Sequence, residues 1–262
     1  MIGETAMSRF IDSCHKTLES FRVSYRSQAL TQLTCIKLAR CPNLKEVEFG
    51  QHLDKYEKIP FDVIGAIKMF ARKCVSHTLT VLKLYECDAE LLGILAQRLH
   101  RVEELQIVKF LQKDSESVSE LLPLSQMKSV KKLNLCSTWF PLKFSVAADD
   151  NGMDVMGNRD FERVIWGLKN SLTHLLLGDY LHDSLLIYIA IMCKQVEVMQ
   201  LNSAQLTDGS IYHVLKSCTQ LTALDVSGCL KFTGAAFQEV DEDEYKATKL
   251  RWLQVNLDGY EM

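Results

Sequence analysis

Apolar residues recur along the chain in a short spacing, at positions 1, 4 and 6 of a pattern whose ninth position sometimes holds cysteine. The stretch "LTVLKLYEC" fits fully, with Leu79, Leu82, Leu84 and Cys87. The stretch "LTALDVSGC" fits with valine at position 6. Read with any apolar residue, the pattern begins at nine places, which are Leu18, Leu44, Leu79, Val102, Val130, Leu172, Val196, Leu221 and Leu250. The chain is therefore an array of repeats.

The spacing predicts a short strand in every repeat. Positions 4 and 6 lie on one face of an extended chain, and positions 3, 5 and 7 lie on the other. In the repeat that begins at Leu221, Leu224 and Val226 should point into the core, and Asp225 and Ser227 should point outward. Most intervals between repeats fall in or near the range of about 20–29 residues that is typical of leucine-rich repeats.

The segments between the predicted strands have the apolar spacing of helices. We predict helices from Asp88, from Asp183 and from Asp208, which is a candidate N-cap, and Pro60 falls near the start of another. Each repeat is then a strand, a turn and a helix. The sequence thus predicts an α/β fold, a leucine-rich-repeat solenoid (horseshoe) of about nine strand–helix units, with a parallel β-sheet on the concave face and helices on the convex face.

The repeats predict one domain over residues 1–262, with a short helical lead at 1–17. Two inserted loops interrupt the spacing, at about 50–60 and at 137–160. Long loops in compact repeats commonly carry function or are disordered. Trp139 and Phe140 lie in the second loop, where they either dock a partner or fold back onto the array.

The nine cysteines are dispersed along the chain. Five of them fall at two positions that the repeat defines, which are position 9 and the third residue before a repeat: Cys87, Cys229, Cys41, Cys193 and Cys218. Free cysteine packs as a small buried hydrophobe, so we expect these thiols in the core. Together with a start that lacks signal-peptide character and the lack of an N-x-[ST] sequon, the thiols favour an intracellular location, cytoplasmic or nuclear.

The net charge of −3 and the pI near 6.2 bear on which class of partner the chain binds. They give no general attraction to nucleic acid or to an anionic membrane. No apolar run approaches the roughly 18 residues of a transmembrane helix. We therefore expect other proteins as partners, with no nucleic acid and no membrane.

The segment "LKSCTQLTALDVSGCLKFTGAAF" resembles the cysteine-containing repeats of the F-box/leucine-rich-repeat family. "CPNLKEVEFG" and "CKQVEVMQLNSAQLTDGSIYHVL" share the likeness, which extends over residues 14–257. Members of that family use the repeats to bind substrates of a Skp–cullin ubiquitin ligase, so the resemblance implies a protein-binding role and a Skp-type adaptor or a multi-subunit complex as partner. The 17 residues ahead of the first repeat are too few for an F-box, and similar repeats also serve as scaffolds.

Candidate catalytic and metal-binding groups do not converge. The seven histidines belong to no H-E-x-x-H motif, and neither a G-x-S-x-G nor a phosphate-binding glycine motif is present. Cys74 and His77 have ligand-like spacing without a second pair. An EF-hand built on Gly152 would place Ala147 and Asn158 where acidic ligands belong. We expect a chain that is not an enzyme and has no metal or cofactor.

Outward positions of stacked repeats form rows across the sheet. Those of the N-terminal half offer side chains typical of interfaces, since Tyr and Arg are frequent anchors. The candidate protein-binding residues of the concave face are Arg22, Tyr25, Glu48, Lys83, Tyr85, Glu86 and Lys109. The alternative is a merely solvated sheet face. The rows of the middle and late repeats are small and bland.

The last predicted strand, "LRWLQVNL", is followed by five residues. Because a solenoid needs a cap over its terminal repeat, we expect a partner or further chain to cover this edge. Trp252 and Tyr260 therefore join Trp139 and Phe140 as candidate protein-binding residues of the loop and the C-terminal edge. The sequence supports a recognition module that acts as an adaptor or substrate receptor; the alternative is a structural scaffold subunit of a large intracellular assembly.

Overall fold

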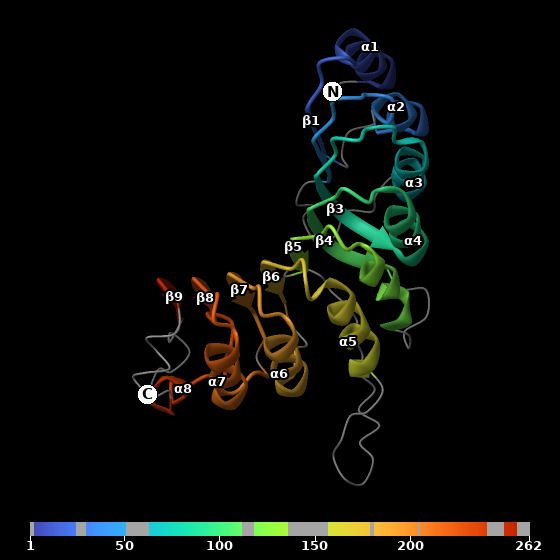
Figure 1. Ribbon diagram of the computed structural model, residues 1–262. Helices are drawn as coiled ribbons and strands as arrows, with labels where there is room; N and C mark the ends of the chain where they lie inside the picture. Colours follow the sequence, from blue (N-terminus) through green and yellow to red (C-terminus); the bar gives the residue numbers. More distant parts are fainter. Residues whose placement is uncertain are drawn as a thin grey trace. The chain divides into compact units, whose positions relative to one another are not determined.

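A computed structural model describes residues 3–24, 30–50, 63–111, 118–135, 157–178, 181–203, 205–239 and 249–255. The chain forms two compact units, Met1–Leu111 and Gln112–Met262. Each unit is built from the same strand–helix repeat, with its helices along one face of its strands (Figure 1). The expectation of a single domain stays a prediction.

The first unit contains four strands and four helices among its described residues. In chain order they are α1 (Glu4–Cys14), β1 (Ser20–Val23), α2 (Gln32–Leu38), β2 (Glu46–Phe49), α3 (Val63–Lys73), β3 (Val81–Asp88), α4 (Ala89–Arg98) and β4 (Glu104–Leu111). The strands pair in chain order and in parallel. β3 and β4 are twice as long as β1 and β2, with eight residues each against four.

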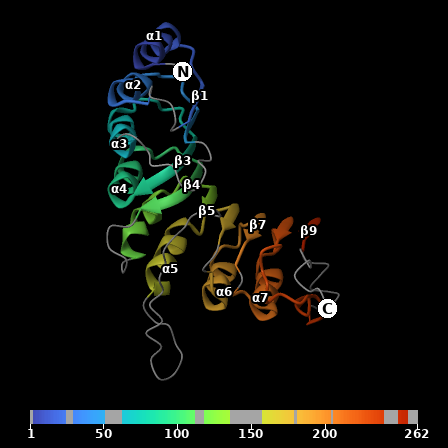
Figure 2. The same cartoon turned by 180° about the vertical axis from the view of Figure 1, so that it is seen from behind.

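The second unit has five described strands. Its elements are the 3-10 helix η1 (Val118–Gln126), β5 (Lys132–Leu135), α5 (Gly157–Leu168), β6 (His174–Leu177), α6 (Asp183–Met192), β7 (Val198–Leu201), α7 (Asp208–Ser217), β8 (Ala223–Asp225), α8 (Ala236–Glu239) and β9 (Trp252–Gln254). Its strands also pair in chain order and in parallel, and the reverse view shows its helices on one side again (Figure 2). The sequence did not predict η1, in which Pro123 lacks the N–H that a regular α-helix needs.

The predicted repeat sets both the strand starts and the core. The nine strands found among the described residues all begin at position 3 of the pattern, and positions 4 and 6 are buried in the first eight repeats. The ninth repeat differs, because Leu253 at position 4 of β9 is 41% exposed. The predicted leucine-rich-repeat fold is confirmed, except that Leu253, at position 4 of the last described strand, is exposed instead of buried.

One backbone contact joins neighbouring repeats throughout both units. The carbonyl oxygen at position 2 accepts hydrogen bonds from the N–H groups at positions 2 and 3 of the next repeat. Glu19, for example, accepts from Lys45 at 2.7 Å and from Glu46 at 3.1 Å. The same double acceptor recurs at Lys45, Thr80, Lys131, Thr173, Glu197 and Thr222. This contact fixes the register of each strand on the one before it.

The three predicted helix starts are confirmed, and the N-cap role of Asp208 is corrected. Asp88 is the N-cap of α4 and accepts the backbone N–H of Leu91 at 2.8 Å, and α6 begins at Asp183. Asp208 is not the N-cap of α7. Thr207 occupies that position, and Asp208 is the first helical residue, which frees its carboxylate to contact the following repeat.

The cysteine prediction is confirmed. Cys41, Cys87, Cys193, Cys218 and Cys229 are all buried. Burial raises the pKa of Cys193 to about 12 and, with only a small opposing effect of a nearby lysine, that of Cys218 to about 11. These thiols are therefore protonated packing groups at neutral pH.

Several sequence-predicted positions lie outside the described residues. They are Tyr25, Pro60, Trp139, Phe140 and Tyr260. Within the described part of the chain, none of the helices has the length and apolar character needed to cross a bilayer.

Candidate functional site

The outward side chains of β1 to β4 form two rows across the first unit. One row follows position 5 and runs through Arg22, Glu48, Lys83 and Gln106, which the strand register places side by side. The other follows position 3 and runs through Ser20, Glu46, Val81 and Glu104. We call these eight residues, together with Tyr85, the first strand face.

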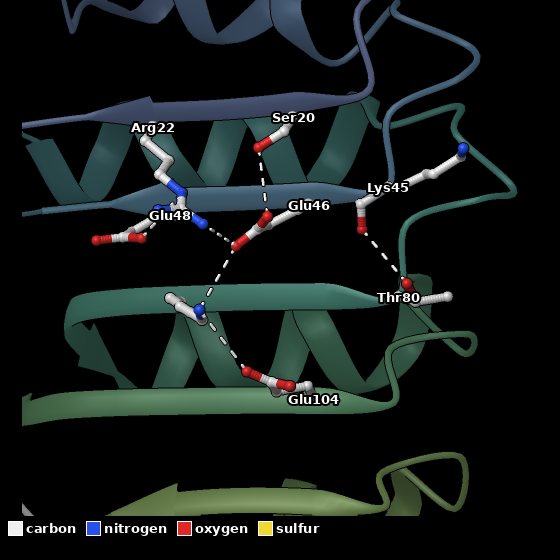
Figure 3. Close-up of polar contacts among 8 residues, drawn as sticks. Ser20, Arg22, Lys45, Glu46, Glu48, Thr80 and Glu104 are labelled. Atoms are coloured by element: carbon white, nitrogen blue, oxygen red, sulfur yellow. Dashed lines mark hydrogen bonds and ion pairs between the residues drawn. The ribbon is translucent and has the colours of Figure 1, made fainter.

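An ion network links the charged residues of the first strand face (Figure 3). Glu46 lies between two cations, 3.0 Å from the Arg22 guanidinium and 3.4 Å from Lys83 Nζ. Lys83 in turn reaches Glu104 at 3.7 Å, and Arg22 reaches Glu48 at 3.5 Å. The network therefore spans all four strands of the unit, with its carboxylates and cations alternating.

The network holds Glu46 in its ionised form. Partial burial alone raises the pKa of this carboxyl, but the hydrogen bond and charge of Arg22 and the charge of Lys83 outweigh it and hold the pKa below its usual value. Ser20 donates a further hydrogen bond to Glu46 at 3.3 Å. Glu46 is thus the shared anion on which both cations are positioned.

Exposure differs among the members of the face. The Arg22 side chain is 63% exposed, whereas that of Lys83 is 27% exposed and held among carboxylates. Tyr85 is half-buried beyond Lys83 on the same strand. The face therefore offers one exposed guanidinium, paired with Glu46 and Glu48, and an aromatic ring beside a fixed ammonium group, which is a mixture found at protein interfaces.

Glu86 and Lys109 are brought together, and of the two only Lys109 is exposed. Glu86 is only 7% exposed, and its carboxylate pairs with Lys109 Nζ at 3.0 Å. The simple alternation of β3 ends here, because Glu86 and Cys87 are both buried. The expected outward position of Glu86 is corrected; a binding role for the pair stays a prediction.

The sequence reading missed Glu46 and Glu104. Both occupy position 3, whereas the predicted residues of the concave face occupy positions 5, 7 and 8. A signal was present, since glutamate stands at position 3 in two repeats of the first unit. What the sequence could not show was that a single position-5 lysine would bridge both of them.

A second charged cluster lies on the helix side of the first unit. Lys68 of α3 contacts Asp88 at 2.7 Å and Glu90 at 2.6 Å, and Arg72 contacts Glu90 at 2.7 Å. Burial alone lowers the pKa of Lys68, but hydrogen bonds to the two carboxylates outweigh it and raise the pKa. Because Asp88 also caps α4, this cluster joins α3 to the start of α4 and is structural.

The outward rows of the second unit carry little charge. The position-5 row runs through Asn134, Leu176, Gln200, Asp225 and Gln254. Asp225 is buried and accepts the backbone N–H of Ser227 at 2.9 Å. Uncharged residues thus predominate in this row, and the exposed Trp252 of β9 lies outside it, at position 3.

In the part of the chain that the structure describes, no three His, Cys, Asp or Glu side chains gather in a group that could hold a metal ion. No protein-family model matches the chain, and no curated protein sequence matches it.

Solved structures that are similar to the chain include the following two. The crystal structure of a Rad7 and Elc1 complex in yeast aligns at 15% identity and a TM-score of 0.47, over 97% of this chain and 77% of that chain. The leucine-rich repeat-containing protein LegL7 from Legionella pneumophila aligns at 12% identity and a TM-score of 0.45, over 98% of this chain and 89% of that chain.

Proposed function

We infer that this protein is a non-catalytic protein-recognition module and that the first strand face binds its partner. The observation that carries the proposal is the ion network over β1 to β4, in which Lys83 and Glu46 are each shared by two partners of opposite charge. Exposed ion pairs stabilise a fold by only about 0–1 kcal/mol each. Because the network adds so little to the stability of the fold, its main effect in this proposal is to orient these side chains for a partner.

The charge pattern favours a protein partner over a nucleic acid. Each cation of the network already has carboxylates beside it: Arg22 has Glu46 and Glu48, and Lys83 has Glu46 and Glu104. A phosphate backbone would meet these carboxylates first, and like charges repel. A protein surface with both signs can instead exchange pairs with the network and gain specificity from its register.

The finer role we propose is that of an adaptor or substrate receptor in the cytoplasm or nucleus. It rests on the likeness of the repeats to those of F-box/leucine-rich-repeat proteins. A scaffold subunit is the second candidate, and one observation favours it, the exposure of Trp252 and Leu253 on β9. A scaffold held through that edge would not depend on the first strand face.

The test compares two tagged variants purified from the native cells, with mass spectrometry of the proteins that accompany them. Lys83→Glu replaces the shared cation of the network by a fourth carboxylate. Gln200→Glu places the same carboxylate at the same repeat position of β7, with a charge change of one instead of two, so it is the control matched in position and in the introduced side chain. We expect Lys83→Glu to reduce the main partner at least about tenfold and Gln200→Glu to retain it.

The identity of the recovered proteins separates the two roles. Recovery of a Skp-type adaptor together with a cullin would support the receptor role, whether Lys83→Glu loses both of them or keeps both. A stoichiometric set of other proteins would support the scaffold. Partners that survive Lys83→Glu unchanged would show that the first strand face is not the recognition surface.

A further inference from the structure

The edge of β9 differs from the other strands that the structure describes in what covers its inward side chain. In the eight earlier repeats the position-4 side chain is buried, and in β8 the equivalent Leu224 is fully buried. In β9, Leu253 is 41% exposed and its neighbour Trp252 is 48% exposed. The inward position of the last described strand is therefore ready to be covered by another strand.

The backbone at this edge also resembles that of the earlier repeats, because it carries the position-2 carbonyl that accepts hydrogen bonds from a following strand. In seven pairs of neighbouring strands, three in the first unit and four in the second, the position-2 carbonyl accepts two N–H groups from the strand that follows. Arg251 occupies position 2 of the ninth repeat, and its own N–H bonds Thr222 in this way at 2.8 Å. Among the residues that the structure describes, no donor reaches the Arg251 carbonyl.

The side chain at Arg251 indicates the charge of what would dock. Position-2 side chains of neighbouring strands lie within reach of each other, as Lys45 and Glu19 show by pairing at 2.8 Å. Arg251 is exposed, and Lys249 beside it contacts only the neutral Gln220 among described residues, at 2.6 Å. A docked strand with an acidic residue at position 2 would meet Arg251 as Glu19 meets Lys45.

We propose that β9 is a docking edge for an extended segment of a partner protein, which adds as a parallel strand with an acidic residue opposite Arg251 and an apolar residue over Leu253. The partner's two N–H groups bond the Arg251 carbonyl, so main-chain bonds give affinity and the two side chains give specificity. This surface lies in the second unit and does not depend on the first strand face.

A second copy of the chain is a poorer occupant in this register. β1 would have to supply the added strand, and its inward residues Phe21 and Val23 are already covered, at 6% and 8% exposure. They have no bare apolar surface to place against Leu253. The chemistry of the edge is therefore better matched by an extended segment with its own apolar and acidic residues.

The chain itself supplies a suitable probe. Residues 194–203, "KQVEVMQLNS", carry glutamate at position 2 and methionine at position 4 of the seventh repeat. A fluorescent peptide of this sequence is titrated with the full chain and followed by anisotropy, and a matched peptide has lysine in place of that glutamate. We expect the glutamate peptide to bind about fivefold more tightly, which is the effect of one exposed ion pair.

A charge reversal on the protein gives the reciprocal measurement. Arg251→Glu should invert the preference, so that the lysine peptide binds better. Gln254→Glu adds a carboxylate to the same strand away from position 2, and it should leave the order of the two peptides unchanged. Arg251→Gln should bind both peptides equally and replaces Arg251→Glu if that variant does not fold.

Hydrogen exchange locates the binding. The glutamate peptide should slow amide exchange in β8 and β9 and leave β1 to β4 unchanged. The proposal is overturned if neither peptide binds at millimolar concentration, if the charge of position 2 has no effect, or if protection falls elsewhere. A chain that forms a dimer through β9, which the peptide does not dissociate, would show that a second copy is the occupant.

Discussion

The carboxylate of Asp183 at the start of α6 accepts two hydrogen bonds from Thr207 of the next repeat, from its backbone N–H at 2.9 Å and from its hydroxyl at 2.6 Å. Asp208 repeats the arrangement one helix later. It accepts from the N–H and hydroxyl of Thr233 at 3.0 and 2.8 Å, and from the N–H of Ala236 at 3.1 Å. Each aspartate thus tethers the turn ahead of the following helix.

Removing one of these tethers should destabilise the second unit. Asp208→Ala leaves three donors of Thr233 and Ala236 without their acceptor. Hydrogen bonds to charged groups contribute about 1.5–3 kcal/mol each to stability, and water that bonds the freed donors replaces part of this loss. We expect a decrease of about 2 kcal/mol in the free energy of unfolding, measured by urea denaturation.

The control for this variant is another aspartate in the first turn of a helix. Asp160 of α5 has an ion pair with Arg163 in its own helix, at 2.9 Å. Asp160→Ala should therefore lower stability by only about 0.5 kcal/mol or less. Equal losses in the two variants would show that the contact between repeats adds nothing.

The same tether should make stability depend on acid pH. Burial alone raises the pKa of Asp208, but hydrogen bonds from Thr233 and from backbone N–H groups outweigh it and hold the pKa below the usual value of 3.8. A carboxyl whose pKa is lower in the folded than in the unfolded state contributes its full stabilisation of the fold at pH values above the unfolded pKa. That contribution is lost as the pH falls through the folded pKa.

The stability difference between wild type and Asp208→Asn should therefore shrink as the pH falls from 7 to 3. Urea midpoints at several pH values measure it. The difference between wild type and a variant without a changed ionisable group, such as Gly93→Ala, should stay constant over the same range. An Asp208→Asn difference that is constant with pH would exclude the ionised carboxylate as the source.

Two glycines should respond to alanine in opposite directions. A Cβ on Gly228 would overlap the amide oxygen of Asn202 and lie 2.8 Å from its Cα, so the two turns must move apart. Gly93, inside α4, has open space around the same atom. We expect Gly228→Ala to destabilise the protein by about 1–3 kcal/mol and Gly93→Ala to stabilise it by about 0.5–1 kcal/mol.

Thermal unfolding followed by circular dichroism measures both glycine variants under one condition. The melting temperature should fall for Gly228→Ala and rise for Gly93→Ala. Similar shifts in both would show that Asn202 does not limit the approach of the two turns.

The buried thiols should resist modification until the chain unfolds. Burial raises the pKa of Cys35 to about 12, and burial reinforced by nearby Cys14 and Cys74 raises that of Cys41 to about 11, so neither forms thiolate near pH 8. Cys14 and Cys74 are only partly buried. Alkylation of the native protein with peptide mapping should mark these two before the six thiols that are buried among the described residues; early labelling of Cys35 or Cys41 would contradict the packing.

The sequence was sufficient for features that depend on one repeat alone. The apolar spacing placed every strand start and the buried pairs of the first eight repeats, because burial at positions 4 and 6 is a property of each strand. It failed at contacts between repeats. The bridge from Lys83 to both Glu46 and Glu104, and the tether from Asp208 to Thr233, join residues from separate repeats.

A comparison of whole repeats would have shown part of this. Aspartate at 183 and 208 is followed, in each case one repeat later, by threonine at 207 and 233. The assignment of Asp208 as an N-cap treated its helix as isolated, although the neighbouring turn competes for the same carboxylate. Tyr25, Trp139, Phe140 and Tyr260 remain predictions, since they lie outside the described residues.

Because of the double-acceptor contact, the register of the strands does not depend on the length of the connections between repeats. Thr173 reaches Lys131 over 42 residues, and Thr222 reaches Glu197 over 25, yet both strands start at the same repeat position. Evolution can therefore lengthen a connection without shifting a strand. The same property means that residues can be added between two repeats without changing which residues of their strands pair, because the paired backbone groups belong to the strand starts alone.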